Sequence, residues 1–230
     1  AQAQVPLLDS ATIKTRDFKV QKGSDLAKFN IYMNGKNEKI QPALALVPYL
    51  YTLQPSGHLY SSMVETGVAT NVQSTTWLDD DFNLVFMGAI YAPSHDPQKI
   101  ENSLIQGVEQ SKKFDDVELK RVKNLMRNAN DNLLSNAAAV GGMLSDYMVS
   151  SHGDWAQYFR DQQAIQNLTV PETNATLKAF LTPNHRFNGD IQPTPEDQKK
   201  ALEQKQASEK PKTLDPVSYT HLRAHETVLD

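Results

Sequence analysis

The chain has 230 residues, of which 39% are hydrophobic, enough for one large domain or for one domain with a tail. Lysine and arginine number 23 against 27 aspartate and glutamate, and the net charge of −4 argues against a dedicated nucleic-acid binder. The chain has no cysteine, which excludes disulfides, thiolate zinc sites and cysteine nucleophiles. Since no stretch reaches the ~20 apolar residues that cross a bilayer, we expect no membrane span.

Three segments are expected to lie outside the folded domain, which we place at residues 15–194. Residues 1–14 are a polar lead-in without periodicity. Residues 195–215 are rich in Pro, Glu, Gln, Lys and Ser, so we predict an inter-domain linker that cannot bury enough surface to fold. Residues 216–230 resemble a translated sequencing-library adapter, and we interpret this tail, with His221 and His225, as an artefact rather than a zinc site.

The first elements of the domain are two strands and an interrupted helix. Alternating apolar residues predict strands over 13–20 and 27–33, the second ended by a turn at Asn34-Gly35. Residues 40–53 are mostly apolar and predict a buried helix. Pro48 lies inside this run and is expected to kink or restart the helix, because proline lacks the amide hydrogen that a helix interior needs.

A short helix and a hairpin are expected next. Residues 58–65 predict the helix, with Ser56 as its N-cap. Residues 68–77 and 84–91 are rich in β-branched and apolar side chains and predict an antiparallel strand pair. The aspartates at 79–81 lie between these strands and indicate a solvated hairpin turn, because they lack the spaced oxygens of a calcium loop.

The rest of the domain is predicted to be mainly helical. The helices are expected to begin at Pro97, near Asp115, at Ser135, after Asp154 and at Val170, and a closing strand is expected over 186–192. Trp155, Tyr158 and Phe159 are expected to face inward. This order predicts an α+β fold, in which a mostly antiparallel sheet has several helices packed on one face.

Four groups of residues, spread over most of the domain, resemble a known family. They are Pro55, Ser56, Gly57, Leu59, Tyr60 and Glu65; Glu118, Arg121 and Lys123; Gly153, Asp154 and Trp155; and Arg186, Gly189, Pro193 and Thr194. In this order and spacing they resemble the second domain of the insulinase/pitrilysin-type zinc peptidases. The fold implied is that of a mitochondrial-processing-peptidase-like domain.

The resemblance implies a non-catalytic domain that helps to enclose a peptide substrate. In this family the zinc motif, His-x-x-Glu-His, lies in the preceding domain. No histidine before the tail begins such a motif: these are His58, His95, His152 and His185. We therefore expect no catalytic residue, metal or cofactor in this chain, zinc in the full-length parent, and the parent's catalytic domain and a peptide as partners.

Three further expectations concern the parent protein and the signature residues. Because the chain begins at Ala1 without an apolar signal core, we interpret it as a piece of a longer protein, and the resemblance suggests a periplasmic or cell-envelope location. The alternative is a non-catalytic scaffold or binding subunit of the same fold. We interpret the signature residues as structural: Pro55-Ser56-Gly57 as a helix-entry turn, Glu65 as a surface carboxylate, and Trp155 as a core anchor beside a capping Asp154.

Overall fold

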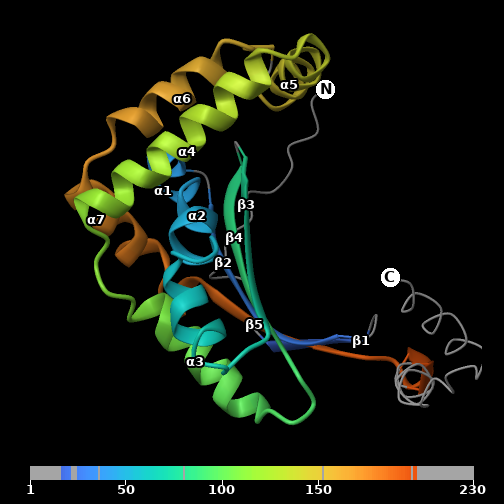
Figure 1. Ribbon diagram of the computed structural model, residues 1–230. Helices are drawn as coiled ribbons and strands as arrows, with labels where there is room; N and C mark the ends of the chain where they lie inside the picture. The colour runs from blue at the N-terminus through green and yellow to red at the C-terminus, as the bar shows by residue number, and fades with distance from the viewer. Residues whose placement is uncertain are drawn as a thin grey trace, which may run out of the picture.

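The computed structural model describes residues 17–21, 25–35, 37–79, 81–151, 153–197 and 199–200. A five-stranded sheet carries helices on one face (Figure 1), and its strand order is β1-β5-β2-β4-β3. The strands are β1 (Asp17–Gln21), β2 (Leu26–Gly35), β3 (Asn71–Leu78), β4 (Phe82–Tyr91) and β5 (Arg186–Gln192). The predicted α+β fold is confirmed. The lead-in, His152, most of the predicted linker and the tail lie outside the described residues.

The pairing of the strands is antiparallel except between β1 and β5, which run parallel. The predicted β3–β4 hairpin is confirmed, and its turn is closed by the Asp79 amide, which donates to the carbonyl of Phe82 at 3.0 Å. The turn predicted at Asn34-Gly35 is wrong. Both residues continue β2, because β4 is long enough to pair with them as far as Gly35.

The interrupted helix is confirmed as two short helices, each with a proline in its first turn. A 3-10 turn, η2 (Glu38–Ile40), leads into α1 (Gln41–Leu44), and α2 (Val47–Tyr51) follows after a break. The first turn is where a helix tolerates proline, because the N–H groups there have no partner within the helix.

The next helical segment begins at His58 and ends in a π-helical turn, η3 (Tyr60–Val64). Its first helical residue directly follows Gly57, so Gly57 and not Ser56 stands at the N-cap position. The expected cap at Ser56 is therefore one residue out of place.

Five longer helices complete the domain. They are α3 (Pro97–Glu109), α4 (Asp116–Leu134), α5 (Ala137–Ser150), α6 (Gln157–Asn167) and α7 (Val170–Phe180). Four of them, all except α6, have a side chain at the N-cap that accepts a hydrogen bond from a first-turn amide. Asp154, the predicted cap of α6, instead accepts from the amide of Ala156 at 3.2 Å, in the turn before the helix.

The core lies between the sheet and the helices. Its largest fully buried side chains are Tyr32, Phe180, Leu44, Leu46, Leu50, Leu59, Met63, Met87, Ile100 and Leu104. Each of the apolar ones contributes roughly 1.5–3 kcal/mol by leaving water. Two expectations about the core are wrong: Trp155 is 50% exposed and Phe159 is 43% exposed, whereas Tyr158 is buried as predicted.

These exposed aromatic residues belong to a helical arm, which we define as residues 127–160. Figure 1 shows that the later part of α4, α5 and the start of α6 extend past the end of the sheet. Because the arm lies beyond the sheet, its outward side chains have no strand to pack on. This explains why Trp155 and Phe159, although aromatic, stay half exposed.

Candidate functional site

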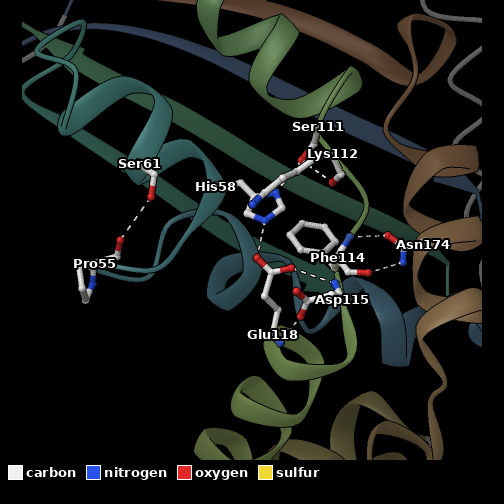
Figure 2. Close-up of polar contacts among 9 residues, drawn as sticks. All are labelled: Pro55, His58, Ser61, Ser111, Lys112, Phe114, Asp115, Glu118 and Asn174. Carbon is white, nitrogen blue, oxygen red and sulfur yellow. Dashed lines mark hydrogen bonds and ion pairs between the residues drawn. The ribbon is translucent and has the colours of Figure 1, made fainter.

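Two of the four signature groups meet at a buried pair formed by Glu118 and by His58, which lies between Gly57 and Leu59 of the first group. Nε2 of His58 lies 2.7 Å from Oε1 of Glu118, and Nδ1 of His58 lies 2.9 Å from Oγ of Ser111 (Figure 2). The side chains of His58 and Glu118 are only 8% and 15% exposed. The contact joins the start of the 58–64 helix to the start of α4, which are 60 residues apart in the sequence.

Gly57 lets the chain bring His58 to this position. A Cβ at Gly57 would lie 2.6 Å from the carbonyl carbon of Tyr51 and 2.7 Å from the amide nitrogen of Thr52. The backbone therefore passes directly against the end of α2, which only glycine permits. Just before it, Gln54-Pro55 is a cis peptide, and the carbonyl of Pro55 accepts from Oγ of Ser61 at 3.4 Å.

Glu118 is held by the N-terminus of its own helix. Its Oε2 accepts from the amide of Asp115 at 2.9 Å, while Oδ1 of Asp115 accepts from the amide of Glu118 at 2.8 Å. This is a capping box, in which each side chain satisfies the other residue's amide. Burial alone would raise the pKa of Glu118, but the hydrogen bonds from Asp115 and His58 outweigh it and lower the pKa.

Phe114 connects the pair to the rest of the helical layer. Its ring stacks on His58, with centroids 4.2 Å apart and planes inclined by 26°, and its edge contact with Tyr51 has a centroid distance of 5.2 Å. Its backbone amide and carbonyl bond the side chain of Asn174 at 2.9 and 2.8 Å. The site thus joins α2 and α7 to the start of α4, and Figure 2 shows the two hydrogen bonds between Phe114 and Asn174.

The contacts of this cluster suit a structural role rather than catalysis. We call His58, Glu118, Ser111 and Phe114 the clamp, because their contacts hold helices together. Ser111, His58 and Glu118 form a Ser-His-Glu chain, but its order is reversed relative to serine hydrolases, where Nε2 faces the nucleophile and Nδ1 faces the acid. Oγ of Ser111 also donates a hydrogen bond to the carbonyl of Lys112 at 3.2 Å. Stacked on Phe114, His58 has both nitrogens engaged and is not free to move a proton to a substrate.

Lys123 of the second signature group holds a helix end. Its Nζ donates to the carbonyl of Gln166 at 2.9 Å and to that of Leu168, so it bonds two carbonyls at the end of α6. Burial lowers the pKa of Lys123, although Asp116 and Glu172 oppose the effect.

Arg186 and Gly189 of the fourth signature group lie in β5, on opposite faces of the sheet. Arg186 forms an ion pair with Glu109, which also accepts from the hydroxyl of Tyr32 at 3.2 Å, so β5, β2 and the end of α3 are linked. Gly189 lies beneath the ring of Phe29, and a side chain at this position would overlap that ring.

The remaining signature residues lie apart from the His58–Glu118 pair. Leu59 is in the core, Tyr60 is half-buried, and Glu65 is exposed. Gly153, Asp154 and Trp155 lie on the helical arm, where Asp154 pairs with Arg160. Five residues complete the set. Pro55 is exposed, Pro193 is buried, and Ser56, Arg121 and Thr194 are half-buried. The structural role of the signature residues as a set stays a prediction.

Four members of these polar clusters were not predicted from the sequence: His58, Ser111, Asn174 and Glu109. One signal was present for Glu118, because an aspartate three residues before a glutamate at a helix start predicts a capping box. No local signal could have paired His58 with Glu118, because the pairing depends on how the 58–64 helix packs against α4.

The part of the chain that the structure describes contains neither a metal-binding cluster nor a membrane-spanning helix. Within the ranges given above, no group of three or more His, Asp or Glu side chains is arranged to hold a metal ion. No helix among these residues is both long enough and apolar enough to cross a membrane.

Comparisons with known proteins agree with this fold. No family model matches the sequence, and no curated protein matches it. A proposed zinc protease from Bordetella pertussis is 25% identical, with a TM-score of 0.64, over 73% of this chain and 94% of that one. The inactive peptidase domain of a proposed zinc protease from Bordetella parapertussis is 24% identical, with a TM-score of 0.68, over 79% of this chain and 98% of that one.

A larger protein is similar in part. The first half of the periplasmic protease PqqL from Escherichia coli is 14% identical with a TM-score of 0.58, and the match covers 85% of this chain and 47% of that one. The predicted resemblance is therefore confirmed. In fold, this chain resembles the inactive peptidase domain of the insulinase/pitrilysin-type zinc proteases.

Proposed function

We propose that the chain is a non-catalytic domain of a zinc endopeptidase that helps to enclose a peptide, while a zinc-bound water in another domain of the parent performs hydrolysis. The observation that carries this proposal is the match to 98% of an inactive peptidase domain. The use of His58 and Glu118 in a clamp supports it, because this His–carboxylate pair is already committed to holding helices together.

The catalytic domain of the parent is the proposed partner, and the sheet face without helices is its proposed contact. Phe18, Phe29 and Phe86 form a row on this face, with ring centroids 5.2 and 5.4 Å apart. By strand register Trp77 points to the same side, and Phe18 and Trp77 are 37% and 52% exposed. Exposed aromatic side chains that gather on one face are typical of an interface.

The proposed location is the periplasm or cell envelope, supported by the likeness to the periplasmic protease PqqL. The second candidate function is a scaffold or binding subunit of the same fold. The parent sequence before Ala1 distinguishes the two, because a zinc motif there favours the peptidase and a domain without one favours the scaffold.

The proposed function predicts that the purified chain neither binds stoichiometric zinc nor cleaves peptides. Metal content by mass spectrometry, and cleavage of an unfolded fluorogenic peptide with and without a chelator, test this directly. Cleavage that a chelator abolishes, in a preparation containing one zinc per chain, would contradict the proposal and would return attention to His221 and His225 in the tail.

The proposed interface predicts that Phe18→Ser and Trp77→Ser reduce aggregation of the isolated chain while its melting temperature changes little. Both side chains are substantially exposed, so little packing is lost. Light scattering during concentration measures the effect. Phe159→Ser is the matched control, because Phe159 is an aromatic residue on the arm whose exposure, 43%, lies between those of Phe18 and Trp77. If Phe159→Ser reduces aggregation as much as Phe18→Ser and Trp77→Ser do, the sheet face is not the surface through which the chain aggregates.

A further inference from the structure

A cavity of about 340 Å³ lies between the helical arm and the rest of the domain, which we call the body. Residues of η2, of α1 and at the end of β3 form its body side, and residues of α5, of α6 and between these two helices form its arm side. Four carboxylates line it: Glu38 and Asp79 on the body side, and Asp154 and Asp161 on the arm side. None of the described residues that line the cavity is a lysine, an arginine or a histidine, so its lining is negatively charged at neutral pH.

Asp161 lies where the arm joins the body. It directly follows the arm in α6, and α6 packs on α1 of the body. Its Oδ1 accepts from Nε2 of Gln157 at 2.6 Å, and its Oδ2 accepts from the hydroxyl of Tyr147 at 3.2 Å. Asp161 is half-buried, whereas the other three carboxylates of the cavity are exposed. It is therefore the carboxylate that loses most contact with water.

Three other groups act on the charge of Asp161. Arg160 is its neighbour in α6, but this cation forms an ion pair with Asp154, in which the two side chains are 53% and 52% exposed. Glu38 contributes a like charge from the body side of the cavity. Burial raises the pKa of Tyr147, so its hydroxyl keeps its proton and remains a donor to Asp161. Only Arg160 brings a positive charge near Asp161, and Asp154 already binds it.

These surroundings disfavour the charged form of Asp161. Burial raises the pKa of its carboxyl above the usual value, and the charge of Glu38 adds to this effect. The hydrogen bonds from Gln157 and Tyr147 and the charge of Arg160 oppose the rise without cancelling it. Asp161 therefore binds a proton more tightly in the folded domain than in an unfolded chain.

We propose that Asp161 is a pH-sensitive switch that controls how firmly the helical arm is held against the body. When its carboxylate is charged, it shares the cavity with the carboxylates of Glu38 and Asp79, and their mutual repulsion loosens the arm. When Asp161 is protonated, this repulsion ends and its remaining lone pairs still accept hydrogen bonds. The stabilisation is therefore complete below pH 3.8, the usual pKa of the group, and is lost as the pH rises through the pKa in the folded domain.

Asp161→Asn tests the proposal, because asparagine keeps the size of the side chain and an acceptor oxygen but carries no charge. Hydrogen exchange of the full chain, followed by mass spectrometry and corrected for the intrinsic effect of pH, measures how often each segment opens. In the wild type, protection of peptides from α5 and α6 should rise about threefold or more as the pH falls from about 7 to about 4.5. In Asp161→Asn the same peptides should be well protected at both pH values. Other titrating groups, such as His152, are common to both proteins and cancel in the comparison.

Two further variants test the role of the cavity. Glu38→Gln removes the facing charge on the body side and should reduce the pH dependence in part. Asp146→Asn removes an exposed charge of α5 that is not part of the cavity lining, and it should leave the pH dependence unchanged. The proposal is overturned if Asp161→Asn keeps the pH dependence of the wild type, or if Glu38→Gln has no effect on it. It is also overturned if peptides from β2 and β4 change as much as those of the arm, because pH would then act on the whole domain.

Discussion

Replacing Gly57 with alanine is expected to destabilise the domain by about 3 kcal/mol, at or above the upper end of the cost of overpacking. The reason is the close approach of the backbone to the end of α2, where a Cβ would lie 2.6 Å from the carbonyl carbon of Tyr51. A flexible side chain could rotate away, but Tyr51 meets Gly57 through its backbone. The 55–58 turn must therefore shift and carry His58 away from Glu118.

Chemical denaturation of the wild type and Gly57→Ala measures this effect. Gly141→Ala is the matched control, since a Cβ there meets nothing within 4 Å and alanine is the better helix former. The control should gain up to about 1 kcal/mol, so the same substitution should act with opposite sign at the two glycines. Equal stability of Gly57→Ala and wild type would show that the turn can move freely and that the close approach is not needed.

The contrast between the two glycines illustrates what the sequence could predict. Pattern and backbone chemistry predicted the local features correctly: the helix interrupted at Pro48 and the closing strand over 186–192 both appear in the structure. These depend on proline lacking an amide hydrogen and on alternation along a strand, which are properties of neighbouring residues. The reason for a glycine at position 57 depends instead on α2 packing against it.

The wrong expectations share a non-local cause. Trp155 and Phe159, which the sequence predicts to face inward, lie in the turn before α6 and in its first turn, on an arm that extends past the sheet. Asn34-Gly35 has a sequence typical of turns, yet β4 pairs with both residues and extends the strand. In each case a neighbour distant in the sequence, present or absent, outweighed the local preference.

Replacing Glu118 with alanine is expected to cost about 2 kcal/mol, because it leaves His58 without its partner and the amide of Asp115 without its acceptor. The estimate lies below the range for fully buried pairs because the carboxylate is 15% exposed. Glu172→Ala is the matched control: Glu172 forms the same capping box with Thr169 in α7, but no histidine is bonded to it. Thermal melts measure both variants. A smaller decrease in melting temperature for Glu118→Ala than for Glu172→Ala would contradict the proposed clamp.

The dependence of stability on pH separates the charge of Glu118 from its shape. Its pKa in the folded chain lies below the ordinary value of 4.5, so the carboxylate's contribution is complete above pH 4.5 and is lost as the pH falls through the folded-state pKa. Glu118→Gln keeps an acceptor of similar size without the charge. The difference in unfolding free energy between wild type and Glu118→Gln should therefore shrink steadily as the pH falls below 4.5. A difference that stays constant down to pH 3 would mean that the carboxylate acts through its shape alone. The charge of Glu118 in its pairing with His58 would then contribute nothing to the joining of the 58–64 helix to α4.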